Sequence, residues 1–528
     1  MSNDKAKSKA EKMRQDKEDA ADLGHAETNF FTPASELNET AEPRKHGTQA
    51  SRKIAAELLK KLAPWLKTSS HRGSFLTAAL ITVFGLIASL IHPILGAIAI
   101  TIAAYVFLSA PGMMVVCLAC FPLLTSLNAA IFPGEQGSFG VQLVLIAGSF
   151  VALLRMVIYQ GLRPGKLCLM LTALGFAGGL FGALTSTAPG ETILSAIKFI
   201  VPLMPLMFWA DQLGRRGLGL GPSTYAFAGV LTAATFGSLV VLLIGQGQSL
   251  NKTDFQGLFW HPQTCGLILG LACIFSALLP RLPNWLRVVW FLTAFGLMLL
   301  SWTRTAFVAL IIAALLFAIW IWWQRWQLKF RYGQLILMPA TFGLVASLTI
   351  GSAFYASTLK PADYVLETST QLFSEEAYAG ARTFALYRSY ANFVKAPITG
   401  IGFGIPSDAR LLDPVFAKET TERIKMGLGS EVLPDKGNAF LAALEESGVI
   451  GAALWLGLFA FCLALAVKSG PVGLAVGAYL TISNLAEATL FSLGGVGMTL
   501  WIGMIVAMSV KQVDLKIGFG GSKLRNLP

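Results

Sequence analysis

Residues 435–451 read Asp-Lys-Gly-Asn-Ala-Phe-Leu-Ala-Ala-Leu-Glu-Glu-Ser-Gly-Val-Ile-Gly and join the one long polar loop of the chain to an apolar run. Most of the sequence on both sides of this loop falls into apolar runs of about 17–23 residues, the length that a helix needs to span a bilayer. The 528 residues are 54% hydrophobic and only 13% charged. These features exclude a soluble globular protein and predict an all-α, polytopic membrane protein with one large loop that contains helices.

The apolar runs predict about fourteen transmembrane helices, each of bilayer length. Roughly twelve is the lower limit, because the connections between the first three runs are short and uncharged. The runs lie near residues 75–91, 94–110, 113–131, 141–159, 167–187, 193–210, 223–244, 263–280, 286–302, 304–323, 334–356, 448–467, 471–488 and 491–509. No repeat of fixed period is visible, and the two halves do not match as an inverted-repeat transporter would require.

The chain divides into five expected parts. They are a polar tail at 1–73, helices 1–11 at 74–356, a large loop at 357–447, helices 12–14 at 448–510 and a second tail at 511–528. Within the first tail, residues 1–50 favour disorder. Residues 51–67 suit an amphipathic helix on an anionic membrane surface, or a solvated helical linker.

The large loop is too long for a simple connection, so we expect structure within it. Residues 377–395 have helical spacing, and four of them are candidate buried positions: Phe384, Tyr387, Phe393 and Val394.

Loop charge predicts the topology. Five connections carry basic residues, namely Arg155, Arg163 and Lys166; Arg215 and Arg216; Arg281 and Arg287; Arg325, Lys329 and Arg331; and Lys468. A cytoplasmic N-terminus puts all of them inside, as the positive-inside rule requires, and an even helix count returns the C-terminal tail to the cytoplasm. The connections at 133–140, 189–192, 245–262 and 357–438 then face outward. No cleavable signal peptide is expected, because the polar N-terminus lacks an early apolar core.

The net charge of +12 does not indicate nucleic-acid binding, since cytoplasmic loops of membrane proteins accumulate Lys and Arg. The cysteines lie in or beside apolar runs, where we expect them to pack as small hydrophobic residues: Cys117, Cys120, Cys168, Cys265, Cys273 and Cys462. The outward loops hold no His or Cys cluster, so we expect neither a metal site nor a disulfide there.

The spacing within residues 435–451 resembles the motif that ends the large periplasmic loop of bacterial O-antigen ligases and Wzy-type polysaccharide polymerases. The matching residues are Asn438 with the following Phe-Leu, Glu446, Gly448 and Gly451. Three other outward segments resemble family patterns in the same order: Phe255–Gly266, Ser301–Ala306, and Ala381-Arg-Thr followed by Pro397–Gly404. Two positions depart from the family, which typically has Asn at Gln263 and His at Gly437.

The resemblance implies a glycosyltransferase without metal or other cofactor at the periplasmic face of the bacterial inner membrane. Its donor is a glycan on undecaprenyl pyrophosphate, and Arg forks suit those phosphates. The predicted catalytic arginines are Arg304 and Arg382. Arg304 has the alternative of snorkelling to lipid phosphates, and Arg382 that of a solvated loop charge. Arg388 is a further candidate for substrate binding, with a surface role as its alternative.

In the family, the His is thought to act as a base toward the acceptor hydroxyl or to orient it. Other residues are candidates for that role here. Glu446 and His261 are predicted catalytic residues; the alternatives are a helix-capping or interhelical hydrogen bond for Glu446 and a structural interfacial role for His261. Lys436 and Asn438 are predicted to bind substrate. Lys198, near the outer end of an apolar run, either contacts donor phosphate or snorkels to the interface. A His at position 437 is expected to be tolerated in a flexible turn.

Polymerisation of repeat units is the leading function, and ligation of glycan to a lipid or other acceptor is its alternative. A transporter or flippase would place charges at mid-bilayer depth and break helices, whereas here the charges gather at outer ends. A non-catalytic scaffold of a polysaccharide assembly complex is a third possibility, because the family His is absent. The expected partners are lipid-linked glycan, membrane lipids and other assembly proteins, such as a flippase or chain-length regulator.

Overall fold

The computed structural model describes residues 71–128, 131–132, 139–161, 163–186, 189–216, 221–248, 254–279, 281–325, 333–358, 375–404, 436–490 and 496–509. Within these ranges the regular structure is helical, with two isolated β-bridges, Leu127–Phe259 and Gln248–Phe255. The predicted all-α class is therefore confirmed. The tail at 1–70, with the amphipathic helix expected at 51–67, and the tail at 511–528 lie outside the described residues.

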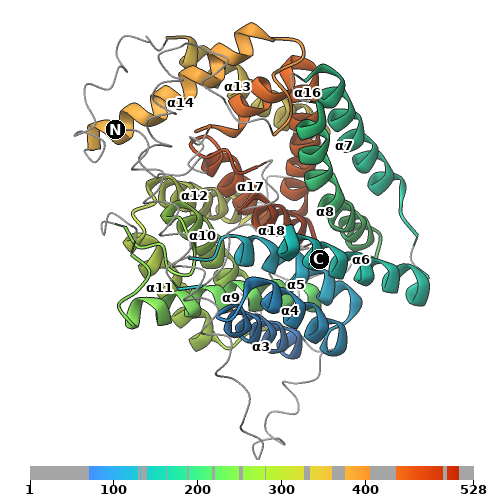
Figure 1. Ribbon diagram of the computed structural model, residues 1–528, viewed down its shortest axis with the longest axis vertical. Coiled ribbons are helices and arrows are strands. Elements are labelled where there is room, and N and C mark those ends of the chain that lie inside the picture. Colours follow the sequence, from blue (N-terminus) through green and yellow to red (C-terminus); the bar gives the residue numbers. More distant parts are fainter. Residues whose placement is uncertain are drawn as a thin grey trace, which may run out of the picture. The chain divides into compact units, whose positions relative to one another are not determined.

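The helices follow one another through apolar sequence (Figure 1). They are α3 (His71–Ser89), α4 (Pro93–Phe107), α5 (Ala110–Thr125), α6 (Phe139–Gln160), α7 (Lys166–Thr185), α8 (Pro189–Arg216), α9 (Pro222–Leu243), α10 (Pro262–Leu278), α11 (Asn284–Leu300), α12 (Arg304–Arg325), α13 (Gly333–Thr358), α14 (Glu375–Lys395), α16 (Ala439–Ser469), α17 (Pro471–Ser483) and α18 (Val496–Ser509). Proline opens α4, α9, α10 and α17, because the first helical position needs no N–H donor.

Each predicted apolar run coincides with one helix. Eight of the described helices are long and apolar enough, by length and composition, to cross a membrane. The other apolar helices have 10–17 residues: α4, α5, α10, α11, α17 and α18. A multi-pass membrane protein is thus supported, while crossing by each shorter helix stays a prediction.

Two boundaries near the large loop differ in detail from the sequence expectation. Helix α16 begins at Ala439, before the expected start at 448, and it has a non-helical residue at Gly448 (φ 60°, ψ −170°). The expected start therefore coincides with a break inside the helix. Helix α14 confirms the helical spacing at 377–395. The predicted burial of Val394 was wrong, because this side chain is 54% exposed.

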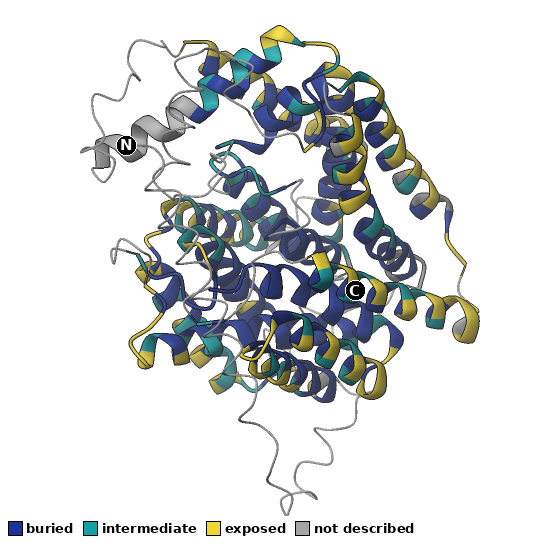
Figure 2. Cartoon of the chain, in the orientation of Figure 1, coloured by how far each residue is buried: buried dark blue, intermediate teal, exposed yellow. Residues whose placement is uncertain are grey.

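Large aromatic side chains fill the interior of the described unit. Trp209, Trp290, Trp455, Trp501 and Tyr479 are among the largest fully buried residues. The exposed flanks, in contrast, carry large apolar side chains, and Figure 2 shows exposed residues along α6 and α7. Such extended apolar surface suits contact with lipid and not with water. All six cysteines are buried and free, which confirms the predicted packing role.

Connections that the charge pattern assigns to one side of the membrane contact one another. The N–H of Phe255 donates to the carbonyl of Leu300 at 3.1 Å, which joins the 245–262 connection to the end of α11. The hydroxyl of Ser186 donates to the carbonyl of Ile401 at 3.2 Å, which joins the end of α7 to the large loop. These contacts fit the predicted topology, and which side faces outward stays a prediction.

Candidate functional site

Ionisable side chains gather where α14 meets the beginning of α16. Glu445 is completely buried, and its Oε1 accepts a hydrogen bond from Nδ2 of Asn392 on α14 at 2.7 Å. The ammonium of Lys436 lies 3.7 Å from Oε2 of Glu445 and 2.5 Å from Oε1 of Glu446. One lysine thus neutralises part of the charge of two adjacent carboxylates, which makes their removal from water less costly.

Asn438 fixes the start of α16, two residues after Lys436. Its Oδ1 accepts from the N–H groups of Phe440 and Leu441 at 2.9 and 3.0 Å, as expected for an Asn N-cap. Its Nδ2 donates to the hydroxyl of Ser352 and to the carbonyl of Leu485, at 3.1 and 2.8 Å. The structure therefore gives Asn438, predicted to bind substrate, a capping and bridging position.

Gly437 forms a turn before this cap. It is buried and has φ 73°, a conformation that costs little only for glycine. The expectation that a His would be tolerated here stays a prediction, and the positive φ, at which side chains are strained, counts against it.

The break in α16 provides a backbone docking site for residues 397–404. Because the helix is interrupted at Gly448, the carbonyls of Glu445 and Glu446 accept from the N–H groups of Ile401 and Gly402, both at 2.9 Å. In the other direction, the N–H of Val449 donates to the carbonyl of Pro397 at 2.8 Å. The two segments are therefore held together by main-chain groups.

Two glycines make this close approach possible. Gly400 has φ 70° and Gly448 has φ 60°. A Cβ on Gly448 would lie 2.2 Å from the carbonyl oxygen of Ile398, and one on Gly400 would lie 2.4 Å from the carbonyl carbon of Glu446. The close approach of the two backbones therefore explains why glycine occupies positions 400 and 448.

Glu446 holds the far end of the docked loop. Its Oε2 accepts from the N–H of Gly404 at 2.7 Å, while its Oε1 pairs with Lys436. The side chains of Glu446 and Lys436 are 13% and 14% exposed, so both stay reachable from solvent. The sequence offered an interhelical hydrogen bond as the alternative to a catalytic role for Glu446. In the structure this bond connects the helix to the docked loop.

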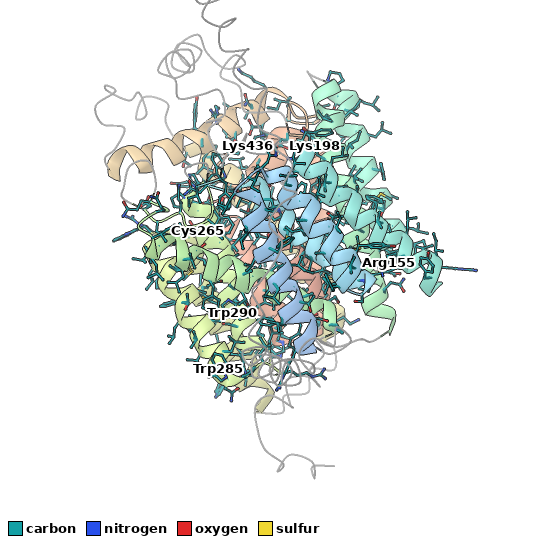
Figure 3. The ribbon with its side chains drawn as sticks, turned by 60° about the horizontal axis from the view of Figure 1, so that its bottom comes forward. Arg155, Lys198, Cys265, Trp285, Trp290 and Lys436 are labelled. Carbon is teal, nitrogen blue, oxygen red and sulfur yellow. The ribbon has the colours of Figure 1, made fainter. Side chains whose placement is uncertain are left out.

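Lys198 lies beside this assembly. Phe403 of the docked loop packs against Phe199 and Trp455, with ring centroids 5.7 and 4.8 Å apart. Lys198 precedes Phe199 on α8 and is exposed. Figure 3 shows Lys198 and Lys436 at the same end of the helices. The structure therefore brings these two predicted cations to one region.

Two candidate arginines lie on α14, and the structure describes the side chain of one of them, Arg388. Arg388 is 4% exposed, so its alternative surface role was wrong, and it stands one turn before Asn392. Arg382 lies on the same helix, and its side chain falls outside the described residues.

A second group lies at the joint between α11 and α12. The hydroxyl of Thr303 donates to the carbonyl of Pro262 at 3.1 Å, and a Cβ on Gly266 would lie 2.3 Å from that hydroxyl. The structure thus brings together the segments 255–266 and 301–306. Arg304 is exposed at the first position of α12, and its predicted contact with phosphate stays a prediction.

His261 caps α10 and is exposed. Its Nδ1 accepts from the N–H of Gln263 at 3.2 Å, so a neutral ring carries its proton on Nε2. In this tautomer Nε2 donates and does not accept. The geometry therefore argues against His261 as a general base.

Sequence reasoning missed Glu445 and Asn392. An ionisable residue next to an apolar helix is a signal for a functional or paired position, and it would have singled out Glu445. Asn392 lies on a polar helix and gave no comparable signal. Among the residues that the structure describes, no group of three His, Cys, Asp or Glu side chains could hold a metal ion.

The comparison with protein families gives one match in this region. Residues 288–456 match a family model described as O-antigen ligase. The matched span contains Arg304, all of α14, Lys436 and the two glutamates, whereas His261 and Lys198 lie outside it. The resemblance seen in the sequence is confirmed, and it supports a glycan-processing function of ligase or polymerase type with a lipid-linked glycan as substrate. No curated protein matches the chain.

Proposed function

From the match of residues 288–456 to the O-antigen ligase family model, we propose that the protein transfers or polymerises oligosaccharide units carried on undecaprenyl pyrophosphate, at the periplasmic face of the bacterial inner membrane. One observation carries the proposal. Within the matched span, Lys436, Glu445 and Glu446 form a charged cluster where α14 meets the start of α16, a helix that is largely apolar. Ionisable groups in such surroundings are costly, and they usually mark substrate sites.

The donor explains why basic side chains are needed. Transfer breaks the bond between the first sugar and the pyrophosphate, and the leaving group gains negative charge as the acceptor hydroxyl attacks. Fixed positive groups stabilise that developing charge. We assign this role to Arg304 and Arg382, with Arg388, Lys198 and Lys436 as further contacts to the phosphates or the glycan.

Glu446 is the proposed acceptor of the proton from the attacking hydroxyl. It is the partly exposed carboxylate of the cluster, and the family His position is occupied by glycine. Lys436 and the N–H of Gly404 hold its two oxygens, which fixes their direction.

Polymerisation is favoured over ligation, because Gly437 replaces the His that is typical of the ligase pattern. The alternative, ligation to a lipid or another acceptor, uses the same donor chemistry. The proposal includes partner proteins of polysaccharide assembly, such as a flippase and a chain-length regulator, with which this protein would work.

A transporter is the second candidate, since the break in α16 is the kind of broken helix that transporters use. Here, however, the main-chain groups at the break are bonded to residues 397–404. They are therefore not directed at a substrate, which favours the transferase.

The test is an assay with purified full-length protein and the lipid-linked oligosaccharide extracted from a strain that lacks it. Arg304→Ala and Arg382→Ala should each abolish transfer, and Lys should restore little, because a point charge does not reproduce the planar fork. Arg163→Ala is the control, since Arg163 is exposed and is expected in a cytoplasmic connection.

Full activity in both alanine variants would refute the phosphate roles. The glycan profile of the deletion strain separates the two reactions. Single units without long chains indicate a polymerase, and full-length polymer without its acceptor indicates a ligase.

A further inference from the structure

Trp302 has an unusual backbone conformation. It lies in the joint between α11 and α12 with φ 51°, and every other positive φ among the described residues belongs to a glycine. A bulky side chain in this region costs of the order of 1–3 kcal/mol, a cost that glycine avoids. The indole is 67% exposed, so burial within the protein offsets little of the strain.

The neighbours of Trp302 enforce this conformation. Thr303 is bonded to the carbonyl of Pro262 at 3.1 Å, and its hydroxyl lies 2.9 Å from that of Ser301. The N–H of Arg304 donates to the carbonyl of Trp302 at 2.9 Å. Because the flanking residues are fixed, Trp302 turns the chain, and its ring is presented directly before Arg304.

A second exposed tryptophan comes from the adjoining joint. Trp260 is 45% exposed, and its ring centroid lies 6.0 Å from that of His261. It stands two residues before Pro262, the partner of Thr303 in the bond between the two joints. One hydrogen bond, from Thr303 to the carbonyl of Pro262, therefore connects the two joints that carry these exposed indoles, and Arg304 follows Trp302 by two residues.

Anchoring in the membrane interface is the common explanation for an exposed tryptophan. An anchor, however, requires no left-handed backbone. Trp285, near the other end of α11, is 68% exposed and is not among the residues with positive φ. Figure 3 shows Trp285 at the end opposite Lys436 and Lys198. One exposed tryptophan with an ordinary backbone thus lies near the start of α11, and the strained one follows the end of that helix.

We propose that Trp302, with Trp260 on the connected joint, forms a platform on which a sugar ring of the lipid-linked glycan stacks. One face of a pyranose presents C–H groups, and the face of an indole is apolar and electron-rich, so the two are complementary. The sugars nearest the pyrophosphate would lie here if Arg304 holds the phosphates. This inference rests on the proposed function and adds the residues that bind the glycan.

The decisive variant is Trp302→Gly, because it removes the ring and the strain together. We expect the KM for the extracted lipid-linked oligosaccharide to rise roughly two- to tenfold, the range of an aromatic contact. The thermal midpoint should stay unchanged or increase. Trp302→Phe should keep a KM within about twofold of the native enzyme, since it retains an aromatic face.

Trp285→Ala is the matched control, and it should change neither KM nor kcat. An unchanged KM in Trp302→Gly would overturn the platform. So would an equal loss in the Trp302 and Trp285 variants that follows their membrane abundance, which is the behaviour of interfacial anchors.

A separate measurement distinguishes this inference from the proposed function. If the native protein does not turn over the extract, the transferase assignment fails. Retention of the extracted glycolipid by the protein in nanodiscs then tests whether Trp302 binds the glycan. Weaker retention by Trp302→Gly than by Trp285→Ala supports it, and equal retention refutes it.

Discussion

At the scale of single residues, the site depends on one lysine that serves two carboxylates. Lys436 has three N–H donors, and it contacts both Glu445 and Glu446. Glu445 is completely buried and has a second partner in Asn392, whereas Glu446 is partly exposed. The two adjacent glutamates therefore differ in position: Glu445 connects α16 to α14, and Glu446 binds the docked loop and remains partly exposed.

The first prediction separates Glu446 from His261. Glu446→Gln keeps the shape but removes the charge, and it should lower polymer output at least about tenfold, within the range of general-base assistance. His261→Ala should cost far less, because it removes a helix cap worth about 1 kcal/mol. Polymer length profiles at equal membrane abundance provide the measurement.

His92 supplies a matched control for this comparison. Like His261, it precedes a proline and caps a helix, with Nδ1 accepting from the N–H of Ile94 at 3.2 Å. His92→Ala and His261→Ala should therefore behave alike. A loss of activity that is confined to His261→Ala would contradict the purely structural role and reopen a catalytic one.

At the scale of elements, the contact between α14 and α16 decides where the predicted arginines of α14 lie. Its polar part is the bond from Asn392 to Glu445, and its main-chain part is the docking of residues 397–404 at Gly448. Helical spacing was enough to predict α14. It was not enough to predict the docking, because main-chain hydrogen bonds leave no side-chain pattern.

Asn392→Ala tests the polar part of this contact. The change leaves Glu445 buried without one of its partners, which typically costs about 1–3 kcal/mol, and it frees the end of α14. We expect a lower thermal midpoint and reduced transfer. Val394→Ala is the control on the same helix, since Val394 is 54% exposed. Equal effects of the two changes would show that the hydrogen bond does not hold α14.

Gly448→Ala tests the break itself. The new Cβ would lie 2.2 Å from the carbonyl oxygen of Ile398, at a φ that alanine rarely adopts, so the cost should exceed about 1 kcal/mol. Gly457→Ala, in the same helix, would place its Cβ 3.8 Å from Phe342, and it should be neutral or stabilising. Thermal unfolding in detergent provides the comparison. A stable Gly448→Ala variant would mean that the loop does not need this close approach.

At the scale of the whole molecule, the sequence predicts helix positions better than it predicts the site. Length and apolarity alone place a helix at each expected run, because a spanning segment must satisfy its own backbone. The start of α16 was misplaced, since Glu445 and Glu446 make residues 439–447 look like loop. Only the pairing with Lys436 and Asn392 explains how a helix accommodates them.

The topology is the last prediction, and the proposed mechanism depends on it. The basic connections should stay in the cytoplasm, so reporter fusions at Lys329 and in the tail at 511–528 should give cytoplasmic signals. Fusions at Gln248 and Ala377 should give periplasmic ones. The structure connects the Gln248 fusion site to Arg304. Gln248 forms a β-bridge with Phe255, and the N–H of Phe255 donates to the carbonyl of Leu300, just before the turn that leads to α12.

The two outward fusions test different parts of the site. A periplasmic signal at Gln248 places Arg304 and Trp302 on the side where the donor is presented, and one at Ala377 places α14 and its arginines there. Full-length fusions of equal abundance, read with a reporter active only in the periplasm and one active only in the cytoplasm, exclude failed insertion as a cause. A cytoplasmic signal at Ala377 would separate α14 from the lipid-linked donor, and the proposed transfer reaction could not take place there.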